Sequence, residues 1–309
     1  MANQFSAAQG IMQRDTYVDN TDKAIDVLWM RRDEHKGVLS KYFDEKSAES
    51  VDFKISSVSS VVDLPRKNED TDGIPYVQPA TGFDKTLTLV PYRSGIRVTD
   101  TMLRVDRQGK IVAMAGGLIK SAMRKQEYLR AGVINTAFTG TAGADSKPLV
   151  GDDHPQENPE AGTWDNEGTG ALTHGNLQSL RLLADNMTNE KGYPDQAFLK
   201  DLLVPTALRQ KAEELTQSVL MPENALNQQN VLIRGLNVVV SPYLTSTTAY
   251  FGFADRTGED KGIYEIYLMK PEMANNSPQN VDIKIDKRVK FVMVVGIGTS
   301  RNVYASLGT

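Results

Sequence analysis

Residues 101–140, TMLRVDRQGK IVAMAGGLIK SAMRKQEYLR AGVINTAFTG, contain the strongest helix signal in this sequence. Mostly apolar residues recur there at steps of three and four: Ile111, Ala115, Leu118, Ile119, Ala122, Met123, Gln126, Leu129 and Val133. That spacing predicts an amphipathic helix of about 25 residues or more. The pair Gly116-Gly117 weakens a helix by about 1 kcal/mol per glycine relative to alanine. We therefore expect a kink or close backbone packing at this pair.

The segment before this helix, residues 51–100, is typical of strands. Two runs alternate apolar and polar residues: Val51-Asp-Phe-Lys-Ile-Ser-Ser-Val58 and Thr86-Leu-Thr-Leu-Val90. A period of two predicts strands. Residues 63–82 between them hold three prolines and two glycines. Two strands joined by so long an irregular tip predict a projecting β-ribbon, which needs a partner surface to be stable.

The tip of this ribbon carries an apolar group, Gly73-Ile-Pro-Tyr-Val77, flanked by the charges of residues 66–72. In a monomer the group would face water, and exposed apolar clusters usually mark an interaction site. We therefore expect Ile74, Tyr76 and Val77 to contact a neighbouring subunit.

Residues 1–50 are polar, with short apolar groups such as Ala24-Ile-Asp-Val-Leu-Trp-Met30. The segment has too little apolar mass for a core of its own. It predicts an extended or partly helical arm, which must dock elsewhere to be ordered.

The remainder, from residue 141 onward, has a mixed α+β pattern. A Gly-, Asp- and Pro-rich loop (141–172) precedes a predicted helix at 173–189. The strand Phe198–Val204 leads into a helix at 206–218, with Pro205 well placed at its first turn. Further strands are expected at 231–233, 236–240, 249–253, 263–269, 281–285 and 289–295. Strand pairs so spaced indicate antiparallel or mixed sheet and not repeated βαβ units.

Composition limits the functions that this chain can have. Its 309 residues include 35 Lys+Arg against 39 Asp+Glu, three histidines and no cysteine. The lack of cysteine excludes disulfides, thiolate metal sites and a cysteine nucleophile. A formal charge of −4 argues against a protein whose whole surface binds nucleic acid. There is neither an apolar run of about 18 residues for a membrane span nor a secretory signal, so we expect a soluble, cytosolic product.

Asp152-Asp153-His154 is the one place where acids and an imidazole cluster. Residues 144–172 hold seven acids against one base, Lys147. Those carboxylates with His154 predict either a divalent metal that activates water or a solvated acidic loop. No second spaced motif, such as a helical His-x-x-x-His, supports the metal interpretation. We therefore expect no catalytic residue, metal or cofactor.

Two other motifs fail at a required position. Residues 68–73 resemble the opening of a calcium loop, but Pro79 stands where the bidentate acid is due. Gly296-Ile-Gly298 resembles a dinucleotide turn, but its third glycine would fall on Arg301.

The predicted long helix is rich in bases. Residues 104–130 hold seven of them against Asp106 and Glu127: Arg104, Arg107, Lys110, Lys120, Arg124, Lys125 and Arg130. Such a run is either an ordinary solvated helix face or a face that meets the phosphates of a polyanion weakly and without sequence preference.

The order of these parts resembles the major capsid protein of tailed bacteriophages, with the Hong Kong ninety-seven type capsid fold, nearest the Mu-like head subunits. Five stretches between residues 83 and 309 carry the resemblance. The first is Thr86-Leu-Thr-Leu-Val-Pro-Tyr-Arg-Ser-Gly-Ile-Arg-Val-Thr-Asp100, similar to the returning ribbon strand. The second, Lys147-Pro-Leu-Val-Gly-Asp-Asp-His-Pro155, resembles the family's Lys-Pro-Leu-Phe and His-Pro loop. The others resemble its central-domain signatures: Leu202-Leu-Val-Pro-Thr-Ala-Leu208, Arg234-Gly-Leu-Asn-Val-Val-Val-Ser-Pro-Tyr-Leu244 and Tyr250-Phe-Gly-Phe-Ala-Asp255.

The resemblance implies an α+β fold divided into five segments. They are an N-terminal arm (1–50), an extended β-ribbon loop (51–100), a peripheral domain with a spine helix (101–194), an axial domain (195–262) and a return to the peripheral domain (263–309). About 50 residues precede the ribbon, so we expect any scaffolding protein to be a separate chain.

The implied function is a head protein that self-assembles into hexamers and pentamers of an icosahedral shell around double-stranded DNA. Its partners would be itself, DNA, a portal protein, and scaffolding and decoration proteins, with no membrane. We expect it in the virion after assembly in the host cytoplasm, with Arg107, Lys110, Lys120 and Arg124 facing the lumen. Two alternatives stay open: an encapsulin-like shell subunit, and a metal-dependent hydrolase at Asp152–His154.

Overall fold

The computed structural model describes most of the chain. It covers residues 21–58, 81–105, 110–140, 143–156, 162–188, 194, 197–221, 229–230, 235–255, 261–275 and 283–308. Within these residues, no helix combines the length and the apolar character that crossing a membrane requires.

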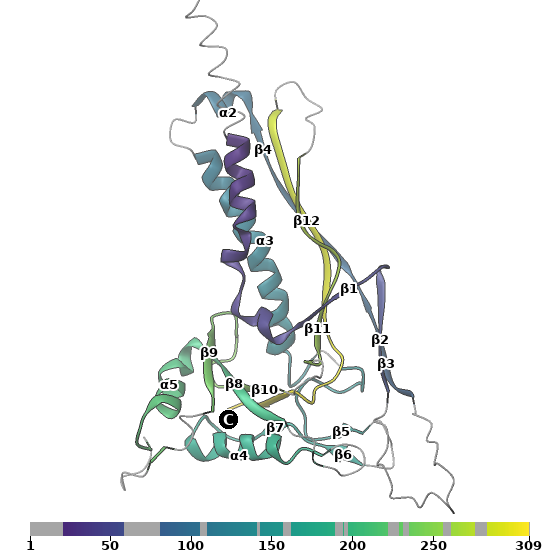
Figure 1. The fold of residues 1–309 in the computed structure, drawn as a ribbon, viewed down its shortest axis with the longest axis vertical. Helices are drawn as coiled ribbons and strands as arrows, with labels where there is room; N and C mark the ends of the chain where they lie inside the picture. The colour runs from purple at the N-terminus through teal and green to yellow at the C-terminus, as the bar shows by residue number, and fades with distance from the viewer. Residues whose placement is uncertain are drawn as a thin grey trace, which may run out of the picture.

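A long sheet with a helix along one face forms the elongated upper part of the molecule (Figure 1). Its strand order is β1-β11-β12-β4: β1 (Asp44–Ser47), β11 (Ile263–Asn275), β12 (Ile283–Ile297) and β4 (Val90–Thr99). Helix α3 (Lys110–Asn135) follows the short helix α2 (Asp100–Val105) and packs on this sheet. The helix predicted from residues 101–140 is confirmed. Its periodic residues Leu118, Ala122 and Met123 meet apolar side chains of β11 and β12.

The arm is docked against this helix and sheet. Residues 21–30 are helical, and two 3-10 turns follow, η1 (Arg32–His35) and η2 (Val38–Tyr42). Ile25 is fully buried in an apolar cluster with residues of α3, β4 and β12. A Cβ at Gly116 would lie at an ordinary contact distance, 3.7 Å, from Leu28 of the arm. The predicted partly helical arm is thus present from residue 21 onward.

The ribbon leaves the side of the molecule as two antiparallel strands, β2 (Asp52–Val58) and β3 (Thr81–Thr88) (Figure 1). Its expected tip lies outside the described residues. Residues 86–100, expected as the returning strand of the ribbon, divide between β3 and β4, and β4 pairs with β12 and belongs to the long sheet. The apolar side chains Tyr92 and Ile96 explain this, because they pack in the core under α3.

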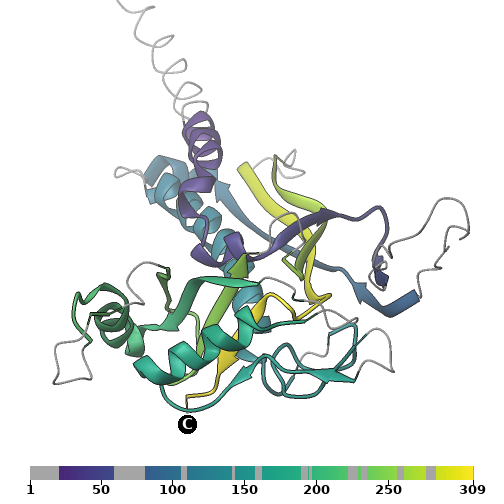
Figure 2. The same ribbon diagram turned by 60° about the horizontal axis from the view of Figure 1, so that its bottom comes forward.

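The lower body contains a five-stranded sheet with helices beside it (Figure 2). The strand order is β7-β13-β10-β8-β9: β7 (Glu167–Gly168), β13 (Val303–Ser306), β10 (Tyr250–Asp255), β8 (Phe198–Pro205) and β9 (Asn237–Ser241). Its helical elements are α4 (His174–Asp185), η4 (Thr206–Leu208) and α5 (Arg209–Gln217). A small hairpin, β5 (His154–Pro155) with β6 (Thr163–Trp164), lies in the stretch predicted as a loop. The sheet takes strands from three of the five expected segments, so their boundaries cut across it.

Two sequence predictions need correction in this region. The strands expected at 281–285 and 289–295 form one strand, β12, because the charged residues between them continue its alternation and do not break it. β13 was not predicted, although Val303, Tyr304 and Ala305 are fully buried. The helix predicted from Thr173 is confirmed at its start, where the Thr173 hydroxyl accepts a hydrogen bond from the Asn176 amide.

Candidate functional site

A buried ionic cluster joins the arm, helix α3 and the long sheet. Arg130 and Glu127 on α3 are each 2 % exposed. Arg130 donates hydrogen bonds to Glu265 of β11 (Nη2 to Oε1, 2.9 Å) and to Glu127 (Nη1 to Oε2, 3.2 Å). Glu127 in turn accepts one from the Leu39 amide of the arm at 2.9 Å. Neither residue belongs to a solvated helix face or to a face that meets a polyanion, as the sequence predicted, because both are buried and paired inside the fold.

The pKa values in this cluster follow from the charges around it. Burial would lower the pKa of Arg130, but hydrogen bonding to Glu265 and its charge raise it above the ordinary value. Burial raises the pKa of the Tyr267 phenol, and the Glu265 carboxylate raises it further. Arg130 therefore stays charged and Tyr267 neutral, and the Tyr267 hydroxyl donates a hydrogen bond to Glu265 at 2.7 Å.

A second ionic contact holds the helical part of the arm. Lys287 of β12 is 1 % exposed, and its Nζ lies 2.8 Å from a carboxylate oxygen of Asp22 and 2.9 Å from one of Asp26. A buried lysine is tolerated only when its charge is paired. The arm therefore covers the charge of Lys287.

Three of the four bases expected to face the lumen are among the described residues. Lys110, Lys120 and Arg124 are exposed on α3, on the side away from the sheet core, whereas Arg107 lies outside the described residues. Lys125 lies over the rings of Tyr92 and Tyr128, at 5.2 and 5.4 Å from their centroids. An exposed basic face thus exists on α3, and the sign of its charge suits a polyanion.

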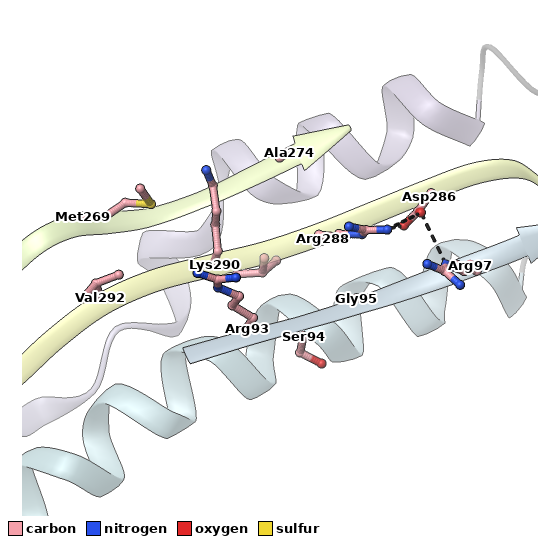
Figure 3. Close-up of a pocket in the computed structure, with 11 residues that line it drawn as sticks. Arg93, Ser94, Gly95, Arg97, Met269, Ala274, Asp286, Arg288, Lys290 and Val292 are labelled. Atoms are coloured by element: carbon pink, nitrogen blue, oxygen red, sulfur yellow. Dashed lines mark hydrogen bonds and ion pairs between the residues drawn. The ribbon is translucent and has the colours of Figure 1, made fainter. Parts of the chain in front are cut away.

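The opposite face of the long sheet carries a groove of about 800 Å³ (Figure 3). Successive residues of a strand point to opposite faces. Val289, Phe291 and Met293 of β12 face α3, so Asp286, Arg288, Lys290 and Val292 line the other side. Across from them on β4 lie Arg93, Gly95 and Arg97. Four bases and one acid therefore line this groove.

One end of the groove is rigidly organised. Asp286 accepts hydrogen bonds from Arg97 (Nε, 3.4 Å) and from Arg288 (Nη2, 3.0 Å), drawn as dashed lines in Figure 3. A Cβ at Gly95 would lie 3.0 Å from the Arg288 side chain, so glycine leaves room for Arg288 to cross the strand pair. Sequence reasoning missed this groove. The signal that could have found it is the period of two across Asp286, Arg288 and Lys290.

The Asp152-Asp153-His154 loop separates into two environments. Asp152 and Asp153 are exposed, and hydrogen bonding to Lys147 lowers the pKa of the Asp153 carboxyl. His154 is fully buried. Its ring stacks on Trp164 at 4.5 Å, and its Nδ1 lies 2.6 Å from Asp145 and 3.4 Å from the Ser300 hydroxyl.

This arrangement does not suit hydrolysis. Asp145 and Ser300 both contact the same nitrogen of His154, so the imidazole cannot link them as an acid–base relay does. Among the described residues, no three His, Asp or Glu side chains come together as a metal site would need. Two of the seven acids counted in residues 144–172, Glu157 and Glu160, lie outside the described residues.

Two acids near this loop repel a third, Glu167. Burial raises the pKa of Glu167, and the charges of Asp152 and Asp165 raise it further. The ionised carboxylate of Glu167 is therefore less favourable in the folded chain than in the unfolded chain, and folding stability is lost as the pH rises through the raised pKa.

Replacing Glu167 with glutamine should accordingly raise the melting temperature of the unassembled chain at neutral pH. The gain should vanish below about pH 4, where the carboxyl is protonated in both folded and unfolded chains. Thermal unfolding of the variant and of the unmodified chain over a pH series measures this difference in melting temperature. A variant that melts below the unmodified chain at pH 8 would contradict the repulsion.

The expected intersubunit residues Ile74, Tyr76 and Val77 lie outside the described residues. Their role stays a prediction.

Comparison with known proteins identifies the family. A family model described as phage capsid protein matches residues 83–306. The chain belongs to this family. As a phage capsid protein it is a capsid shell subunit and a component of the virion. Capsid proteins are structural shell proteins, which fits the expectation that the chain is not an enzyme. No curated protein sequence matches it.

Solved structures support the phage capsid fold. The capsid of cyanophage P-SCSP1u has a TM-score of 0.55 at 9 % identity, covering 86 % of each chain. The mature capsid of bacteriophage PhiM1 has a TM-score of 0.53 at 13 % identity, covering 88 % of this chain and 86 % of the other. The structure of Microbacterium phage Oxtober96 has a TM-score of 0.51 at 9 % identity, covering 88 % of this chain and 90 % of the other. The predicted capsid fold is confirmed.

Proposed function

We propose that this capsid protein is the major head subunit, which assembles into hexamers and pentamers of an icosahedral shell around double-stranded DNA. Shell formation follows from the family. The observation that supports DNA as the contents is the exposed basic face of α3 at Lys110, Lys120 and Arg124. In this proposal that face, together with Arg107, borders the lumen, and the ribbon residues Ile74, Tyr76 and Val77 contact an adjacent subunit.

The proposal extends to domains and partners. Residues 101–194 and 263–309 form the peripheral domain and residues 195–262 the axial domain, with β7 and β13 completing the axial sheet. Assembly takes place in the host cytoplasm with a portal protein and with separate scaffolding and decoration proteins. No membrane or cofactor takes part.

Neutralising the exposed bases of α3 tests the contents of the shell. The triple variant Lys110→Gln, Lys120→Gln, Arg124→Gln should assemble closed shells that retain less DNA after a salt wash. Each phosphate contact removed should flatten the slope of log affinity against log salt by about 0.9. Nuclease-protected DNA per particle, measured over a salt series, reports both effects.

A matched control uses exposed bases of the lower body, Lys200→Gln and Arg209→Gln, which should leave DNA retention unchanged. If the α3 variant holds its DNA with the same salt dependence as the unmodified particle, the lumen assignment is wrong. Particles that enclose protein cargo and no DNA would instead favour the encapsulin-like alternative. Genes for a portal and a terminase beside this one would favour the phage interpretation.

A further inference from the structure

We infer that the basic groove on the face of the long sheet opposite α3 receives the acidic surface around Asp152, Asp165 and Glu167 of a second copy of this chain. This inference rests on the proposed shell function and adds to it a specific contact between subunits. It follows from two unfavourable charge arrangements that one chain carries at different ends of its fold.

The first is a pair of bases placed directly opposite each other. Arg93 of β4 and Lys290 of β12 are cross-strand partners. Like charges at such positions destabilise a sheet pair. The nearest acid on this row is Glu272 of β11, 3.8 Å from Lys290, and within the described residues Arg93 has no ion pair. An anion seated over Arg93 and Lys290 would turn the repulsion into attraction.

The rest of the groove is suited to a protein segment more than to a nucleic acid. Met269, Ala274 and Val292 give it an apolar part beside the bases (Figure 3). Asp286 orients the guanidinium groups of Arg97 and Arg288 through its carboxylate. Ordered guanidinium groups recognise carboxylates with defined geometry. Carboxylates on a short loop that also presents apolar atoms match these features.

The second unfavourable arrangement is the acidic surface itself. The described part of residues 148–180 contains four acids and no lysine or arginine. One of these acids, Asp153, pairs with Lys147, which leaves Asp152, Asp165 and Glu167. Asp152 is exposed, and the charges of Asp152 and Asp165 raise the pKa of Glu167. A basic partner would relieve the repulsion among these acids. An acidic partner would likewise relieve the repulsion between Arg93 and Lys290 in the groove.

One copy cannot bring the two surfaces together. The groove lies on the long sheet, whereas β5, β6 and β7 lie in the lower body (Figure 1). The contact therefore forms between copies, and it joins two different surfaces. Such a head-to-tail contact generates a ring when its rotation closes, which is the geometry that a hexamer or pentamer requires.

Charge reversal gives the first test. Arg93→Glu places an acid opposite Lys290, and Asp152→Arg places a base beside Asp165 and Glu167. Both changes should preserve or raise the melting temperature of the single chain. Each should nevertheless lower the yield of particles at least about tenfold, because it sets like charges against each other between copies. The double variant should recover the yield, and Arg93→Lys should assemble normally.

Crosslinking gives a second test that does not depend on assembly yield. The chain has no cysteine, so Ala274→Cys in the groove and Thr169→Cys beside Glu167 introduce two unique thiols without removing any charge. Particles of the double-cysteine chain, treated with a short bismaleimide, should give a ladder of covalent oligomers beyond the dimer. Either single-cysteine particle should give no ladder.

The outcomes separate the inference from the function on which it rests. Unmodified and double-cysteine chains that both form particles, with no ladder after crosslinking, would overturn the groove contact alone. So would Arg93→Glu particles of normal yield that have lost their DNA, because the groove would then bind nucleic acid. An unmodified chain that forms no particle under any assembly condition would instead overturn the proposed function and the contact together.

Discussion

Replacing Arg130 with methionine should destabilise the folded chain by about 3–5 kcal/mol, the usual cost of removing one partner from a buried ionic group. Methionine fills much of the arginine volume but leaves Glu127 and Glu265 buried without the cation that both of them contact. The loss should reach the arm as well, because Glu127 accepts the hydrogen bond from the Leu39 amide. Urea unfolding of the unassembled chain measures the change.

Two further variants show whether charge is the cause. Arg124→Met, on the exposed face of the same helix, should change the free energy of unfolding by less than about 0.5 kcal/mol. Adding Glu265→Gln to Arg130→Met should restore part of the lost stability, because it removes one of the two unpaired carboxylates. If Arg130→Met unfolds at the same urea concentration as Arg124→Met, the ionic cluster does not hold the arm, helix and sheet together.

Deleting residues 66–82 behind a short Gly-Ser turn should abolish closed particles while leaving a soluble, folded body. The described apolar clusters lie outside this segment, so the body keeps its core. Covering Ile74, Tyr76 and Val77 by an adjacent subunit would contribute roughly 1.5–3 kcal/mol for each large side chain. A closed lattice repeats that contact once per subunit, so its loss is multiplied across the particle.

Sedimentation and circular dichroism of the deletion variant separate the two effects. The expected result is a melting temperature close to that of the unassembled parent, with capsomers or smaller species only. The triple substitution of Ile74, Tyr76 and Val77 by serine is the gentler companion and should weaken assembly without shortening the ribbon. Normal closed particles from the deletion variant would show that the ribbon is not an intersubunit arm.

The elements that local periodicity defines could be predicted from the sequence. α3 is an example, because its apolar residues repeat at steps of three and four. Leu118 and Met123 pack on the long sheet, and Val133 packs with residues of the lower body. The strand β8 could also be predicted, from the run Phe198–Val204, and the helical segment after it from Pro205 at its start. β12 was divided in two because its charged residues were taken as a break, although Ile285, Lys287 and Val289 continue one face of the strand.

The candidate functional surfaces were harder to predict, because their members are distant in sequence. In the sequence Arg130 is one of seven bases between residues 104 and 130, and only the fold brings Glu265 to it. The groove forms because β4 pairs with β12, although the two strands lie almost 200 residues apart in the sequence. This pairing places Arg93 opposite Lys290. Lys287 likewise meets Asp22 and Asp26 only when the arm docks. A single sequence gives the charges of these residues but not their partners.

Electron microscopy of the purified full-length chain, expressed alone and with a candidate scaffolding protein, tests most directly whether this is the major subunit of an icosahedral head. We expect closed shells built from six-membered and five-membered rings. In a reconstruction, α3 should lie nearer the inner surface than the opposite face of β4 and β12. A homogeneous small oligomer that never forms rings or shells under either condition would contradict the assignment of this chain as the major subunit of an icosahedral head.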